Sequence, residues 1–304
     1  MKFFCLLAIL IGVFSVDISC QQPRFDRFDV SSGLSQNNIN GLVIDQNGNI
    51  WAGTLDGLNR FDGSGFEVFK PGPEGKNHIS GNHVTTMGKG FDGDVWIHTR
   101  GGGLDRYDAS GKKFLHYADS IFQKGGVAPV SNLVQVDDSL LLFSDGPRLG
   151  IFDLTQNQCI NLRMPGFVSG IEQGPESAWV YGEFGIRHYA LSARDHGSSP
   201  LNLLHQIDTP CYQLTRAGDF MYALFDSGIW RFAKFEGEGT QMIAFDALNL
   251  PKEDLSSMNS FAVRDSVFWL GGNNILVNIE KQNGVWKARP FEYEPSNDYS
   301  FKGH

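Results

Sequence analysis

Short runs in which apolar and polar residues alternate recur along most of the chain, and turns rich in Gly, Asn and Asp separate them. The first clear set comprises residues 39–44, a run that carries Trp51, residues 58–61 and residues 66–69. Alternation with a period of two is typical of a strand buried on one face. The turns over 45–48 and 62–65 contain Gly beside Asn or Ser, which suits tight hairpins. The pattern therefore predicts a unit of four antiparallel strands.

A second copy of this unit follows directly. Residues 57–62 read Gly-Leu-Asn-Arg-Phe-Asp and residues 103–108 read Gly-Leu-Asp-Arg-Tyr-Asp, while Trp51 returns as Trp96, 45 residues later. A period of this length fits one four-stranded blade of a β-propeller. We expect the tryptophans to fill the gap between neighbouring blades, where twisted sheets meet face to face.

Four weaker copies have the same order of landmarks, with spacings of 38 to 47 residues after the first pair. Their strand-ending residues are Leu141, Trp179, Tyr222 and Trp269. Six repeats are thus visible over about residues 34–295. We predict an all-β fold, a β-propeller of four-stranded antiparallel blades in which six blades are visible and which forms part of a seven-bladed ring.

The two ends of the repeat array suggest how the ring closes. Residues 24–30 resemble the fourth strands of the first two units and are expected to form one closing strand, so the propeller would cover residues 21–304. Residues 296–304 resemble the start of a further repeat, as residues 77–83 do. Our leading hypothesis is a fragment that lacks a seventh blade, and the alternative is a closed six-blade ring.

The first twenty residues predict an export signal. Lys2 precedes an apolar stretch from Phe3 to Val16 that is too short to span a bilayer comfortably, so a cleaved peptide is favoured over an anchor. Cleavage is expected near Cys20. Lipidation of Cys20 is the alternative, although Asp17 stands where lipoprotein signals usually carry an aliphatic residue. No later segment is apolar and long enough to cross a membrane.

Composition and residue spacing limit the kinds of partner, cofactor and catalytic site that we expect. The chain has 25 Lys and Arg against 34 Asp and Glu, a formal net charge of −9, and no basic run, which argues against nucleic acid as a partner. The eight histidines show no zinc-ligand spacing, and Gly101 to Gly103 lack the helix and lysine of a phosphate-binding loop. Cys159 and Cys211 lie in different repeats and are expected to be unpaired thiols. We therefore expect no metal, no cofactor and no catalytic residue.

Candidate ligand-binding residues follow from the predicted topology. Propellers usually bind ligands over one end of the central channel, in the loops that join the second strand to the third and one blade to the next. On this sequence those loops hold Asn37, Asp56, Asn82, His83, Arg100, Arg148, Glu183, Asp226 and Asn273. Arg100 and Arg148 are favoured, since a guanidinium can fork onto a carboxylate or onto sugar hydroxyls.

At residues 33–39, 48–54 and 57–62 the sequence resembles the repeats of two-component regulator propellers, specifically over residues 24–117 and only in pattern over 127–295. That resemblance implies seven-bladed propellers, usually in tandem, in the periplasmic part of hybrid histidine kinases of polysaccharide-degrading bacteria. It implies an exported, periplasmic module that senses an oligosaccharide and relays to a membrane and histidine kinase region absent from this chain, with a homodimer formed through the parent sensor.

Two alternatives to a non-enzymatic sensor stay open. One is a freestanding propeller scaffold that binds a protein or a surface glycan. The other is a carbohydrate-active hydrolase or lyase, because strands that are distant in sequence meet at a propeller's centre and sequence spacing does not report the separation of two carboxylates.

Overall fold

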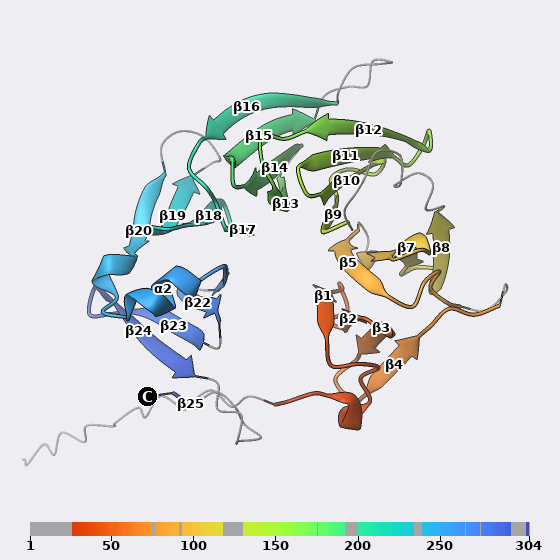
Figure 1. Cartoon of the computed structure of the whole chain (residues 1–304), viewed down its shortest axis with the longest axis horizontal. Coiled ribbons are helices and arrows are strands. Elements are labelled where there is room, and N and C mark those ends of the chain that lie inside the picture. Colours follow the sequence, from red (N-terminus) through yellow and green to blue (C-terminus); the bar gives the residue numbers. More distant parts are fainter. Residues whose placement is uncertain are drawn as a thin grey trace, which may run out of the picture.

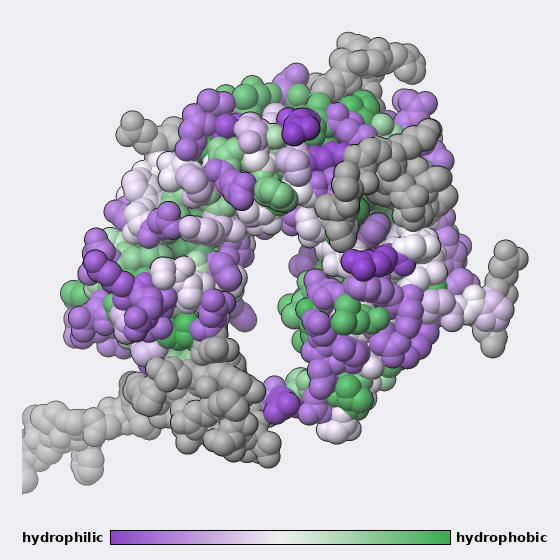
Figure 2. All heavy atoms as spheres, in the orientation of Figure 1, coloured by the Kyte–Doolittle hydropathy of each residue, from purple (hydrophilic) through white to green (hydrophobic). Residues whose placement is uncertain are grey.

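Six antiparallel sheets form a ring around a central opening (Figure 1), and the opening persists when all atoms are drawn (Figure 2). The computed structural model describes residues 26–73, 77–90, 93–117, 130–174, 176–191, 200–233, 239–264, 266–273, 275–292 and 302–303. Within these residues each sheet has four strands in sequence order, and the sixth carries a short fifth strand. The predicted all-β propeller of four-stranded antiparallel blades is confirmed.

The strands of blades 1 to 3 are β1 (Ile39–Ile44), β2 (Ile50–Thr54), β3 (Gly57–Phe61), β4 (Phe66–Phe69), β5 (Val84–Lys89), β6 (Val95–Thr99), β7 (Gly103–Asp108), β8 (Lys113–Tyr117), β9 (Asn132–Gln135), β10 (Leu140–Asp145), β11 (Arg148–Asp153) and β12 (Gln158–Arg163). Those of blades 4 to 6 are β13 (Val168–Gly174), β14 (Ser177–Gly182), β15 (Gly185–Leu191), β16 (Leu201–Ile207), β17 (Gln213–Ala217), β18 (Phe220–Phe225), β19 (Gly228–Ala233), β20 (Thr240–Ala244), β21 (Ser260–Arg264), β22 (Val267–Gly272), β23 (Ile275–Gln282), β24 (Val285–Glu292) and β25 (Lys302–Gly303).

Aromatic side chains hold neighbouring blades together as predicted. Trp51 and Trp96 are fully buried, and the Trp51 ring lies 4.6 Å from that of Tyr107 in blade 2. In blade 3 the strand register places Leu142, rather than the predicted Leu141, in the position of Trp51, three residues before the end of the second strand. Leu142 packs toward blade 4 and Leu141 toward blade 2. The pattern misplaced this residue because both faces of β10 are buried, so the strand does not alternate.

In the described part of the chain, short helices interrupt the all-β pattern at three places, and the sequence did not predict them. Two are 3-10 turns, η1 (Val30–Ser32) and η3 (Phe245–Ala247), and the third is the six-residue helix α2 (Lys252–Ser257) between blades 5 and 6. Pro251 precedes α2 and Glu253 lies in its first turn, which is the usual chemistry of a helix start.

The first and last blades do not join as the other blades do. The innermost strands contact one another in the order β1, β5, β9, β13, β17 and β21, whereas β21 and β1 make no comparable contact in the described residues (Figure 1). The side of blade 1 that faces away from blade 2 is apolar and open, with Leu42 65% and Ile44 54% exposed. On blade 6, Trp269 lies on the side away from blade 5 and is half-buried against Phe291.

The expected strand over residues 24–30 does not form among its described residues, 26–30. The Phe28 ring instead packs on Phe61 and Phe66 of blade 1, with centroid distances of 4.9 and 5.9 Å. No described strand stands beside this segment to supply the hydrogen bonds that a closing strand needs. Residues 1–25, with the predicted signal, and most of 296–304 lie outside the described residues, and Lys302–Gly303 pair with β24 at the outer edge of blade 6.

Candidate functional site

All nine predicted site residues lie at one end of the ring, which we call the upper face. The upper face consists of the loops that join the second to the third strand of each blade and the loops that join successive blades. Asp56, Asn82, His83, Arg100, Glu183, Asp226 and Asn273 are in these loops, Asn37 is in the segment that leads into β1, and Arg148 opens β11. The topology thus places the residues as expected, while their contact with a ligand stays a prediction.

Several of these residues connect one loop to the next. Asp56 accepts hydrogen bonds from Asn82 Nδ2 at 2.5 Å and from Lys70 Nζ at 2.7 Å, and these two partners lower the pKa of its carboxyl. The backbone N–H of Arg100 donates to His83 O at 2.9 Å. Asp226 accepts from the Tyr212 hydroxyl at 2.5 Å, which raises the pKa of that tyrosine. Much of the polar chemistry in these loops therefore joins the segments between blades to the loops within blades.

Arg148 is paired within its own blade. Its guanidinium donates through Nε to Asp145 Oδ1 at 2.8 Å and through Nη2 to Asp145 Oδ2, a forked ion pair whose arginine side chain is only 11% exposed. The same guanidinium lies 5.4 Å from the centre of the Phe143 ring. Because Asp145 already occupies both sides of the guanidinium fork, Arg148 orients Asp145. It is not available to bind a carboxylate ligand, which the sequence analysis had expected it to do. Arg100, by contrast, is exposed.

Among the described residues of the upper face, Phe167 has the most exposed large apolar side chain, and the sequence analysis missed it. Its side chain is 58% exposed, yet its backbone is fixed on both sides. The N–H of Phe167 donates to Glu183 Oε2 at 3.2 Å, and the N–H of Val168 donates to Gly146 O at 3.0 Å. Gly146 has a φ of 59° and leaves room for the ring, since a Cβ there would lie 3.2 Å from it. An aromatic residue after Pro-Gly in a loop was the signal that could have identified it.

A Ser, His and Asp cluster also lies in blade 2, but not in the geometry of a nucleophile and its base. Ser80 Oγ donates to Asp105 Oδ1 at 2.5 Å and lies 2.9 Å from His116 Nδ1, the same nitrogen that approaches Asp105. A catalytic histidine would need to use its two nitrogens for two different partners. The His78 ring stacks on that of His116 at 5.0 Å. In the described residues no three His, Cys, Asp or Glu side chains are grouped to hold a metal ion.

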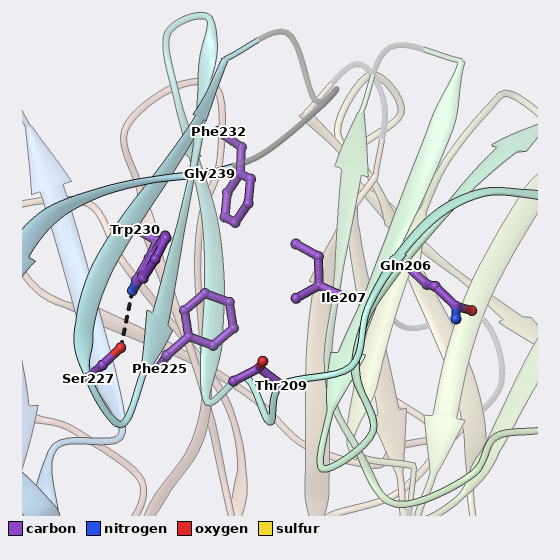
Figure 3. A pocket seen from close by; sticks show the side chains of 8 residues that line it. All are labelled: Gln206, Ile207, Thr209, Phe225, Ser227, Trp230, Phe232 and Gly239. Atoms are coloured by element: carbon purple, nitrogen blue, oxygen red, sulfur yellow. Dashed lines mark hydrogen bonds between the residues drawn. The ribbon is translucent and has the colours of Figure 1, made fainter.

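A cleft opens between blades 4 and 5 beside Asp226. Its volume is about 510 Å³, and its lining residues are Gln206, Ile207, Thr209, Phe225, Ser227, Trp230, Phe232 and Gly239 (Figure 3). The three aromatic side chains come from β18 and β19, and Ile207 faces them from the end of β16 (Figure 3). A cleft of this size can hold a small molecule.

Comparison with known proteins identifies the repeat. A model described as the two component regulator propeller matches residues 33–56. Over 74 residues the chain is 35% identical to a protein described as Histidine kinase P4 of Formosa agariphila, an alignment that covers 24% of this chain and 5% of that protein.

Solved structures share the fold. Two structures of the extracellular domain of one B. thetaiotaomicron protein, described once as a one component and once as a hybrid two component system, superpose with TM-scores of 0.61 and 0.59 at 18% and 19% identity. They cover 92% and 90% of this chain, and this chain covers 42% and 39% of them. PorZ, a surface component of the type-IX secretion system of Porphyromonas gingivalis, has a TM-score of 0.55 at 12% identity over 84% of this chain and 33% of its own.

The fold is therefore that of a propeller domain found in hybrid two-component sensor systems. The chain carries a two-component regulator propeller repeat at residues 33–56. It spans less than half the length of each relative named above. In the part of the chain that the structure describes, every helix is too short or too polar to cross a membrane.

Proposed function

We propose that this chain is the ligand-sensing propeller of an exported two-component signalling protein, and that it binds an oligosaccharide on the upper face without transforming it. In this proposal the propeller lies in the periplasm. The bound state is relayed through a homodimer of the parent sensor to a histidine kinase region outside this chain. The matched repeat and the fold shared with extracellular domains of two-component systems support this proposal.

The observation that carries the proposal is the exposed ring of Phe167 beside the carboxylate of Glu183. An aromatic face offers a flat apolar surface for the C–H groups of a sugar ring, and a carboxylate accepts hydrogen bonds from sugar hydroxyls. The backbone bonds to Glu183 and Gly146 hold Phe167 where blades 3 and 4 meet. A ligand on this ring would touch both blades, so its binding energy can alter their relative position.

The test is a binding screen of neutral and acidic oligosaccharides by calorimetry, with wild type, Phe167→Ala and Leu203→Ala. Leu203 is a matched control because it is similarly exposed, at 51%, but lies on the outer strand β16. We expect Phe167→Ala to weaken binding at least tenfold and Leu203→Ala to leave it unchanged. No binding by the wild type, or equal binding by both variants, would contradict the proposal, and new reducing ends in the mixtures would favour a hydrolase.

We also propose that one further four-stranded blade fills the gap between blades 6 and 1, and that residues 1–20 direct export. The apolar side of blade 1 and the Trp269 side of blade 6 are the two halves of the contact by which the other blades join. A seventh blade would cover both.

A further inference from the structure

The cleft between blades 4 and 5 is separate from the Phe167 loop and has a different chemistry. Its apolar walls belong to the contact between the two blades. Phe225, Trp230 and Phe232 lie on the side of blade 5 that faces blade 4, since they alternate with residues on the other side and join one cluster with Tyr181 and Ile186. Ile207 pairs with Ile186 and stands opposite them (Figure 3).

The few polar groups around the cleft are largely occupied. Trp230 Nε1–H donates to Ser227 Oγ at 3.1 Å, and Gln206 directs its amide away from the aromatic rings (Figure 3). The hydroxyl of Thr209 stands at the same end of the cleft as Ser227 (Figure 3). None of the eight lining residues is charged.

Two described carboxylates that flank the lining residues in sequence, Asp208 and Asp226, have partners elsewhere. Asp208 Oδ1 lies 2.8 Å from Arg187 Nη2, and Arg187 is further held by the carbonyl oxygen of Ile186 at 3.0 Å. Asp226 accepts the Tyr212 hydroxyl. A charged ligand would therefore lose its hydration without gaining an opposite charge from the lining.

The same walls disfavour a sugar. A monosaccharide carries several hydroxyls, and here it would bury most of them against aromatic rings and Ile207 with only two side-chain hydroxyls in reach. Unpaired buried hydroxyls oppose binding. A flat aromatic ring, in contrast, can pack edge-to-face or offset against Trp230 and Phe225, which themselves meet edge-on at 6.3 Å.

We propose that this cleft binds an uncharged aromatic compound that carries one or two hydrogen-bonding groups, with the ring between Ile207 and the three aromatic side chains and the polar group at Thr209 and Ser227. Such a ligand contacts both walls and would tie blade 4 to blade 5. The site goes beyond the proposed function, because it takes a different class of ligand at a different place on the ring.

The probe for the test is 4-fluorobenzyl alcohol, observed by fluorine NMR with the whole chain, and 4-fluorobenzoate serves as its charged counterpart. We expect the alcohol to bind at least tenfold more tightly than the benzoate. Ile207→Trp should fill the cleft and weaken binding of the alcohol at least tenfold. Leu203→Trp, on the exposed part of the same strand, is the matched control and should bind as wild type does.

Thr209→Tyr provides a second filling variant in a loop, should Ile207→Trp disturb folding, and it too should weaken binding at least tenfold. Three results would overturn the proposal. These are a wild type that does not bind the alcohol at all, a wild type that binds the alcohol no more tightly than the benzoate, or two filling variants that both bind the alcohol as wild type does. Oligosaccharide binding by the same variants distinguishes the two sites. The filling variants should still bind the oligosaccharide, whereas Phe167→Ala should lose oligosaccharide binding and keep binding of the alcohol.

Discussion

Asp105 and His116 face each other across β7 and β8, with Oδ1 of the buried carboxylate 2.7 Å from Nδ1 of the imidazole. Asp105 Oδ2 also accepts the backbone N–H of Ser80 at 2.8 Å. In blade 1 the same position holds Asn59, which accepts the N–H of Ser35 at 2.8 Å and donates to its hydroxyl at 2.9 Å. Both blades thus have an equivalent contact between the segment that precedes the first strand and the third strand. In blade 1 a neutral amide makes this contact, and in blade 2 a buried carboxyl group makes it.

Asp105→Asn should convert the contact of blade 2 to the form that blade 1 uses. Burial raises the pKa of Asp105 above its ordinary value of 3.8, although bonds from Ser80 and His116 act in the opposite direction. A carboxyl whose pKa is higher in the folded chain binds its proton more tightly there, so the free energy of unfolding falls as pH rises toward the folded value. The stability of Asp105→Asn relative to wild type should therefore increase with pH, measured by denaturant unfolding from pH 4 to 8.

Asp105→Ala is the contrasting variant. It leaves the N–H of Ser80 without its acceptor and should be about 1–3 kcal/mol less stable than Asp105→Asn at every pH, because both variants lack the titrating carboxyl. Equal losses in the two variants at pH 8 would show that the negative charge, rather than the shape of the acceptor, holds the loop.

Glu172 gives a second prediction about pH. It lies on β13, paired with Trp179, where burial raises the pKa of its carboxyl to about 7 and Lys89 opposes the shift. Wild-type stability should fall between the ordinary pKa of 4.5 and the folded value, because the folded chain holds the proton more tightly over that range. Glu172→Gln resembles the protonated form, so it should gain about 1–3 kcal/mol at pH 8 and clearly less at pH 5.

Urea unfolding at both pH values measures this difference. Glu176→Gln, an exposed position on the next hairpin turn, should change little at either pH. A Glu172→Gln protein that remains as sensitive to pH as the wild type would mean that another group is responsible.

Leu42 and Met87 occupy equivalent positions on the first strands of blades 1 and 2, each one residue before the partner of the blade's tryptophan. Met87 packs against the glycines of blade 1, whereas Leu42 is open in this chain. Met87→Asp should destabilise the chain by about 2 kcal/mol, since it places a charge between two blades. Leu42→Asp should change stability by less than about 0.5 kcal/mol. Thermal or urea unfolding of both variants tests this, and a large loss in Leu42→Asp would mean that this face is covered in solution.

Local patterns were enough to predict the blades. Residues 66–69 were expected to be the fourth strand of the first unit, and β4 spans Phe66–Phe69. Alternating side chains and hairpin turns act over a few residues, so the chain carries this information locally. The pattern lost the register in β10, where Leu141 and Leu142 are both buried and alternation is absent.

The candidate site was predictable only as a set of loops. Chain order placed all nine residues on the upper face, but the partners of Asp56, Arg148 and Asp226 decide which of them can meet a ligand. Phe167 and the cleft beside Trp230 were missed, because exposure and concavity arise where two blades meet.

Trp51 and Trp96, the tryptophans of the two clearest repeats, show what the sequence determined and what only the tertiary structure decided. Their spacing and their packing between blades follow from the repeat, because hydrophobic period and turn chemistry are local properties. Their hydrogen bonds do not: Trp51 Nε1 donates to Asp45 in its own hairpin at 2.9 Å, while Trp96 Nε1 donates to Gln135 of the next blade at 2.8 Å. A buried N–H takes whichever acceptor the assembled ring brings within reach, and only the packing of neighbouring blades determines that acceptor.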